Sequence, residues 1–150
     1  FTVKWNINAS TQDCFCPKFI LFFMVENAIV HNVAKTRKHI DIDIDIIQKK
    51  NDISITVTNS GPGISAKRLA EIQYLLDHPE KRSSMSSKNN GRSIFNINDR
   101  LQLYYGSNYK FSIDSKENIK TVCNVRFNIN RPKIIERALE EIHYAESSVG

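Results

Sequence analysis

The sequence predicts a two-layer α/β sandwich in which helices cover one face of a mixed sheet. Segments with apolar residues at every second position, which is typical of half-buried strands, come mostly in adjacent pairs. Segments with apolar residues at helical spacing separate these pairs. The predicted order is strand, helix, strand, strand, helix, loop, helix, strand, strand, helix. A chain of 150 residues is long enough to bury one core of this kind.

The strands are predicted from alternation. The clearest is HIDIDIDII, in which four isoleucines face one way and Asp41, Asp43 and Asp45 face the other. Like charges at every second position stand about 7 Å apart, so a solvated sheet face explains them better than a metal site does. The predicted strands are residues 1–8, 39–47, 53–57, 109–115 and 119–129.

The helices are predicted from their periodicity and from their end signals. The first begins at Pro17 and ends near Asn32, Ser65 can cap the second, and Gly106 closes the third. Between the second and third helices, PEKRSSMSSKNN is polar and has no periodic pattern, which predicts a mobile loop. The predicted helices are residues 17–33, 66–78, 93–106 and 133–145, and the loop is residues 79–90.

Composition limits the classes of function. Apolar residues make up 41% of the chain and charged residues 25%, as in a soluble globular domain. The longest apolar run, residues 19–25, is too short to cross a membrane. The three cysteines (Cys14, Cys16, Cys123) are an odd number, which argues for free thiols and a reducing compartment. The chain has no starting methionine, so we expect it to be a piece of a longer protein.

The net charge of +5 fits a phosphate-bearing partner. Basic residues are scattered over several segments, and aromatic residues do not interleave with them. Single-stranded nucleic acids are bound by basic grooves with aromatic stacking platforms. We therefore favour a nucleotide over a nucleic acid as the partner.

Three motifs in one order carry a family resemblance. They are VENAIVHN at residues 25–32, ITVTNSGPGIS at 55–65 and GRSIFNINDRLQLYYG at 91–106. They resemble the N-box and the two glycine boxes of the GHKL superfamily, and are closest to LytS/YesM-type sensor histidine kinases. The resemblance implies a Bergerat-type ATP-binding catalytic domain over residues 1–130, followed by a helical extension over residues 131–150.

In the first motif, the resemblance implies that Asn27 is a Mg²⁺ ligand and that Glu26 and His31 take part in catalysis. Mg²⁺ prefers oxygen ligands, which an amide side chain supplies. Many relatives place an acid four positions before the asparagine, where this chain has Phe23. A buried asparagine or histidine that only bonds backbone groups is the alternative.

In the second motif, Gly61 and Gly63 would let the backbone approach adenine closely, with Ile64 following them. The family has aspartate at position 59, where it accepts a hydrogen bond from the adenine amino group, and this chain has Asn59. Because charge assistance makes such a bond roughly twice as strong, we expect weaker nucleotide affinity than in a relative with aspartate. Thr121 is the further expected nucleotide contact.

In the third motif, Gly91 stays glycine, but Arg92 and Ser93 stand where the family has isoleucine and glycine. The phosphate-binding nest at the helix start thus loses one glycine, and Arg92 could compensate by reaching a phosphate. Lys81, Arg82 and Lys88 are the candidate phosphate contacts in the predicted loop, and a solvated basic loop is the alternative explanation for them.

The resemblance implies transfer of the ATP γ-phosphoryl group to a histidine of an upstream dimerisation domain, with ATP and Mg²⁺ as cofactors. The implied partners are that domain, a response regulator and a second copy of the full-length protein, without nucleic acid. The implied location is the cytoplasmic side of a membrane-anchored sensor. A degenerate fold that binds nucleotide weakly, or not at all, and serves as an interaction module is the alternative.

Overall fold

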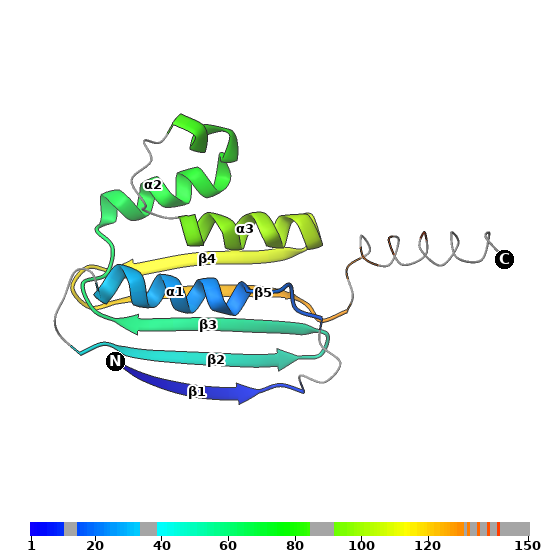
Figure 1. Cartoon of the computed structure of the whole chain (residues 1–150), viewed down its shortest axis with the longest axis horizontal. Coiled ribbons are helices and arrows are strands. Elements are labelled where there is room, and N and C mark those ends of the chain that lie inside the picture. Colours follow the sequence, from blue (N-terminus) through cyan, green and yellow to red (C-terminus); the bar gives the residue numbers. More distant parts are fainter. Residues whose placement is uncertain are drawn as a thin grey trace.

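A computed structural model describes residues 1–10, 15–33, 39–84 and 92–130, together with residues 132, 135, 138 and 141. In these residues, five strands form one sheet in the order β1-β2-β3-β5-β4, and three α-helices lie against it (Figure 1). The predicted α/β sandwich is thus confirmed. The strands are β1 (Thr2–Asn8), β2 (Asp41–Lys49), β3 (Asp52–Ser60), β4 (Tyr109–Lys116) and β5 (Lys120–Asn128), and the helices are α1 (Ile20–Val33), α2 (Ala66–Asp77), η1 (a 3-10 helix, Pro79–Ser84) and α3 (Arg92–Tyr105).

The sheet is mixed because β1 pairs in parallel with β2, whereas the other three pairings are antiparallel. A parallel pair needs a crossover connection. Here the connection contains α1, which lies between β1 and β2 in the chain and packs over the middle of the sheet. The structure extends β3 beyond its predicted end to Ser60, so that Asn59 lies inside the strand.

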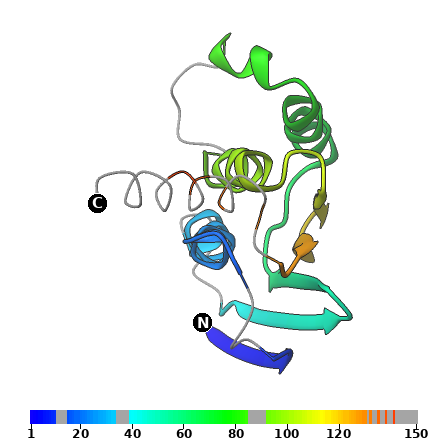
Figure 2. The same ribbon diagram turned by 90° about the vertical axis from the view of Figure 1, so that its right-hand side faces the viewer.

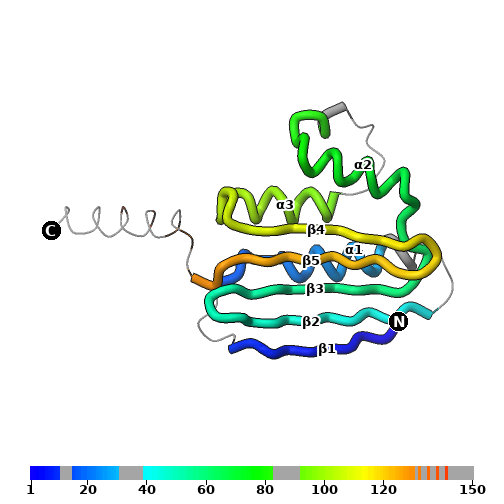
Figure 3. Tube along the Cα trace, turned by 180° about the vertical axis from the view of Figure 1, so that it is seen from behind, coloured from blue at the N-terminus to red at the C-terminus, as the bar shows by residue number. Residues whose placement is uncertain are grey.

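The helices cover one face of the sheet (Figure 2), whereas the view from behind shows the strands in front of them (Figure 3). Alternate side chains of β2, β3 and β5 point into the helical layer and are buried. The main core joins these side chains to the inner faces of α1 and α3. Its most deeply buried members include Ile20, Met24, Ile42, Ile44, Val57, Ile97, Leu101 and Val125.

Two predictions of burial were wrong. The alternation in residues 1–8 predicts a half-buried strand, but β1 is an edge strand whose Trp5 and Ile7 side chains are 56% and 54% exposed. In α3 the helical pattern predicts Tyr104 on the buried face, but Tyr105 is the buried tyrosine, stacked on Phe127. Tyr104 packs at the margin of the core.

Two predictions of local structure differ from what the structure shows. Ser65 stands at the N-cap position of α2, as predicted, but its side chain makes no capping hydrogen bond. Residues 79–84 form η1 instead of belonging to a mobile loop. Gly106 does follow α3 with φ of 60°, and its amide donates to the Gln102 carbonyl at 2.8 Å. Most of the predicted C-terminal helix lies outside the described residues.

Within the described part of the chain, no helix is both long enough and apolar enough to cross a membrane.

The buried thiol of Cys123 gives the fold a pH dependence. Cys123 is 2% exposed, and burial raises the pKa of its thiol from 9.0 to about 12. Below pH 9 the thiol is protonated in both the folded and the unfolded chain. Between pH 9 and 12 only the unfolded chain ionises it, so this group lowers the free energy of unfolding as pH rises.

We expect the difference in unfolding free energy between the protein and Cys123→Ala to shrink by about 2 kcal/mol between pH 8 and pH 10.5. Urea unfolding at the two pH values measures it. The variant is the control for every other titrating group. A difference that stays constant would contradict the pKa assigned to this thiol.

Candidate functional site

The turn after β3 is bound to the turn between β4 and β5. The Asn118 amide donates to the Pro62 carbonyl at 2.8 Å, and the Gly61 amide donates to the Ile119 carbonyl at 3.2 Å. The Ile64 amide donates to Ser115 Oγ at 2.8 Å. The backbone of residues 61–64, which we call the glycine turn, is therefore held by the β4–β5 hairpin.

Gly63 is required by this contact. Its φ is 61°, a conformation that favours glycine, and a Cβ atom there would stand 2.5 Å from the Lys116 carbonyl oxygen. The prediction assigned the glycine to close approach of adenine. The structure gives another reason for a glycine at this position, because the β4–β5 hairpin occupies the space that a Cβ atom of residue 63 would need.

Asn59 and Thr121 lie side by side at the same end of the sheet, because β3 and β5 pair them directly. They are only 3% and 6% exposed. The Asn59 side-chain amide donates to the Ser60 carbonyl at 3.1 Å. Both predicted nucleotide contacts thus lie on adjacent central strands, next to the glycine turn.

Ser115 belongs to this site and was not predicted from the sequence. Its hydroxyl accepts from the Ile64 amide, donates to the Lys120 carbonyl at 2.9 Å and lies 3.0 Å from Thr121 Oγ1. It joins the glycine turn to β5. The signal that could have found it is its register, since Ser115 lies opposite Thr121 in the β4–β5 pairing.

Asn27 of α1 carries the clearest mark of a ligand site. It is 6% exposed, and its Oδ1 atom is buried without a hydrogen-bond partner among the described residues. A buried acceptor without a partner costs about 1–3 kcal/mol, so such an oxygen requires an explanation. A hard cation suits this donor, because Mg²⁺ binds oxygen ligands. The residues present therefore fit the implied metal.

Glu26 and Ser93 connect the first and third motifs. Ser93, in the first turn of α3, donates through Oγ to Glu26 Oε2 at 2.8 Å, and both side chains are half-buried. Arg92 begins α3 and is exposed. The backbone of His31 lies in α1, but its side chain and all of Gly91 are outside the described residues.

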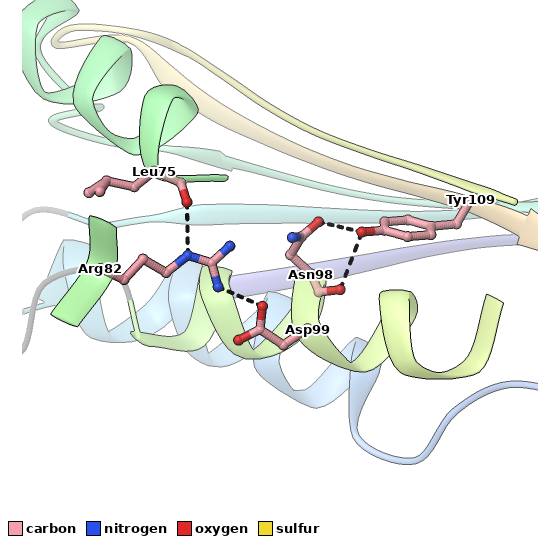
Figure 4. Close-up of polar contacts among 5 residues, drawn as sticks. All are labelled: Leu75, Arg82, Asn98, Asp99 and Tyr109. Carbon is pink, nitrogen blue, oxygen red and sulfur yellow. Dashed lines mark hydrogen bonds and ion pairs between the residues drawn. The ribbon is translucent and has the colours of Figure 1, made fainter. Parts of the chain in front are cut away.

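The predicted role of Arg82 as a phosphate contact is not supported by its surroundings (Figure 4). Its Nε donates to the Leu75 carbonyl at 2.8 Å, and its Nη1 pairs with Asp99 Oδ1 at 2.5 Å. The guanidinium lies over the Phe95 ring, 4.7 Å from its centroid. Arg82 thus anchors η1 to α2 and α3. Lys88 falls outside the described part of the chain.

Beside this anchor, the Tyr109 hydroxyl donates to Asn98 Oδ1 at 2.8 Å (Figure 4). Burial raises the pKa of Tyr109, and the negative charge of Asp99 raises it further, while Arg82 opposes them. Tyr109 and Asn98 line a hollow of about 1220 Å³ beside β4. None of the predicted site residues lines it, so the hollow is separate from the site built around Asn27 and Asn59.

No cluster of three or more histidine, cysteine, aspartate or glutamate side chains able to hold a metal occurs in the described ranges.

The chain is similar to known proteins in sequence and in structure. Residues 18–132 match the family described as histidine kinase-, DNA gyrase B- and HSP90-like ATPase. Sensor protein LytS of Staphylococcus epidermidis is 31% identical over 148 residues, which are 98% of this chain and 22% of that protein. The sensor histidine kinase/phosphatase LytS of Staphylococcus aureus is 28% identical over 116 residues, which are 77% of this chain and 19% of that protein. The chain thus spans about a fifth of the length of these relatives.

Among solved structures, the nucleotide-free catalytic domain of histidine kinase ThkA matches with a TM-score of 0.56 and 17% identity, covering 85% of this chain and 80% of that one. The blue-light activated histidine kinase of Erythrobacter litoralis matches with a TM-score of 0.54 and 16% identity, covering 85% and 35%. At these identities the likeness shows the fold alone.

Gly63 and Gly106 form a matched pair for testing the glycine turn. Both have φ near 60°, but a Cβ at Gly106 meets nothing within 4 Å. We expect Gly106→Ala to cost about 1 kcal/mol, which is the cost of the left-handed backbone alone. Gly63→Ala should cost clearly more, because the Lys116 carbonyl must also move. Urea unfolding of the two variants measures the loss of unfolding free energy in each. Equal losses would show that the hairpin can move to admit a Cβ atom at residue 63 without cost.

Proposed function

The chain belongs to the family of histidine kinase-, DNA gyrase B- and HSP90-like ATPases, and from this premise we propose that it is the ATP-binding catalytic domain of a sensor histidine kinase. It would transfer the γ-phosphoryl group of ATP to a histidine on a dimerisation domain elsewhere in the protein. The similarity to the LytS sensors over 98% of the chain supports this reading.

The buried Oδ1 of Asn27, which has no hydrogen-bond partner in the described part of the chain, is the observation that carries the proposal. An amide oxygen kept dry without a partner is unfavourable until a ligand arrives. A Mg²⁺ ion that accompanies ATP would use this oxygen. When bound, the ion would neutralise charge on the phosphate oxygens.

The other residues have distinct roles in this proposal. Asn59 would accept a hydrogen bond from the adenine amino group at the end of β3. Arg92 and the first backbone amides of α3 would face the phosphates, since a helix N-terminus favours anions. Glu26 would accept the proton of the attacking imidazole or orient it, because its carboxylate lies next to the metal ligand in the sequence and contacts the first turn of α3.

We further propose that residues 1–130 form the catalytic domain and residues 131–150 a helical extension. The dimerisation domain, a response regulator and a second copy would be the partners of the full-length protein. The domain would lie on the cytoplasmic side of a membrane-anchored sensor, where ATP is available.

Calorimetric titration with ATP, with and without Mg²⁺, tests the proposal. We expect Mg²⁺-dependent binding that weakens at least tenfold in Asn27→Ala, since the metal loses its protein oxygen. Asn59→Asp should tighten binding about threefold to tenfold, because the bond to adenine gains charge assistance. Asn96→Ala, which removes an exposed amide from α3, should leave the affinity unchanged.

An unfolding transition equal to that of the parent protein must accompany any loss of binding in Asn27→Ala. No binding by the parent protein, with binding restored by Asn59→Asp, would instead favour the interaction module that binds no nucleotide. Mg²⁺-dependent binding that is unchanged in Asn27→Ala would reject this asparagine as the ligand.

A further inference from the structure

The hydrogen bond between Ser93 and Glu26 crosses the gap between two helices. The two residues are 67 positions apart in the sequence, and the Oγ–Oε2 distance is 2.8 Å. Ser93 is the second residue of α3, and Glu26 lies in the middle of α1. The bond thus links the helix that carries Asn27 to the helix terminus proposed to face the phosphates.

This bond decides where the Glu26 carboxylate points. Successive residues of a helix are about 100° apart, so Asn27 enters the core while Glu26 turns toward α3. A glutamate side chain has several rotatable bonds, and fixing it in one rotamer costs entropy. Glu26 forms no ion pair within 4.0 Å among the described residues, so the Ser93 hydroxyl is the group there that holds it.

The place at which the carboxylate is held suits phosphoryl transfer. The first amides of a helix lack partners within the helix, and its N-terminus carries a partial positive charge, so the start of α3 favours an anion beside it. A carboxylate held at this terminus lies at the phosphate end of the proposed site. A freely rotating carboxylate would spend most of its time elsewhere, and catalytic groups misplaced by about 1 Å lose much of their effect.

We propose that Ser93 is a positioning residue that orients Glu26 for the phosphoryl-transfer step, an inference that rests on the proposed function. Position 93 is glycine in the motif that the sequence resembles. The serine of this chain therefore adds a contact that a glycine at this position could not make. The test must separate this role from the opposite one, in which Glu26 occupies the place of a phosphate and Ser93 stabilises this blocked state. The two roles differ in their effect on nucleotide affinity.

Autophosphorylation of the intact sensor protein that carries this domain tests the proposal. We expect Ser93→Ala to lower kcat about fivefold to tenfold while KM for ATP stays within about twofold, because the hydroxyl orients a catalytic group and does not bind the nucleotide. Ser93→Thr keeps the hydroxyl and should restore kcat. Ser112→Ala removes an exposed serine from β4 and should have no effect.

The variant Glu26→Gln, alone and with Ser93→Ala, completes a double-mutant cycle. We expect the double variant to be no slower than Glu26→Gln alone, since Ser93 acts through that carboxylate. Additive losses would overturn the proposal, and so would an unchanged kcat in Ser93→Ala. Tighter ATP binding with an equal or higher kcat in Ser93→Ala would overturn it in favour of the blocked state. If the parent protein neither binds ATP nor phosphorylates itself, the proposed function fails, and the positioning role fails with it.

Discussion

The pairing of β3 with β5 is the interaction on which the rest of the structure depends. These strands form the middle of the sheet, and their nine-residue register places Ile53, Ile55 and Val57 opposite Phe127, Val125 and Cys123 under the helices. A slip of one residue would turn all of these side chains to the face without helices, so burial fixes the register. Near its end, the same register places Asn59 opposite Thr121. The core and the site are therefore aligned by a single set of hydrogen bonds.

Strand pairing also explains why the site lies at the end of the sheet where β3 finishes and β5 begins. The glycine turn leaves β3 where the β4–β5 hairpin turns back, and the two turns bond to each other through backbone groups and Ser115. α1 packs over these strands and buries Asn27, and α3 packs beside α1 with its first turn bonded to Glu26. Polar groups from distant parts of the sequence are thus carried by helices and strands that share one core. A rigid support of this kind holds catalytic and binding groups in place at little entropic cost during a reaction.

The sequence predicts most of the fold because alternation and helical periodicity are local signals. It predicts the wrong burial for Trp5 and Ile7, since the position of β1 at the sheet edge is a property of topology. Tyr105 replaces Tyr104 in the core because a difference of one residue in helical phase is too small to read from so few apolar positions. The Arg82 anchor gives no periodic signal.

Within the site, the family resemblance predicts Asn27, Asn59 and Thr121 as contacts, and the structure buries all three side chains. The sequence could not predict the bond between Glu26 and Ser93 or the part played by Ser115, because both depend on how distant segments meet. The sequence also could not show that Gly63 is needed to avoid the Lys116 carbonyl, because residues 63 and 116 come together only in the folded chain. The burial of Asn27, Asn59 and Thr121 could be anticipated from the sequence, whereas the contacts between the motifs could not.

Paramagnetic broadening by Mn²⁺ with ATP is the most direct measurement of where a metal–nucleotide complex binds. Amide resonances of Asn27, of the glycine turn and of the first turn of α3 should broaden, because these groups surround the proposed metal and phosphates. Resonances of Tyr109 and Lys110, which line the hollow beside β4, should stay sharp. Broadening centred on that hollow, or equal broadening without nucleotide over the whole surface, would contradict a nucleotide site built on Asn27.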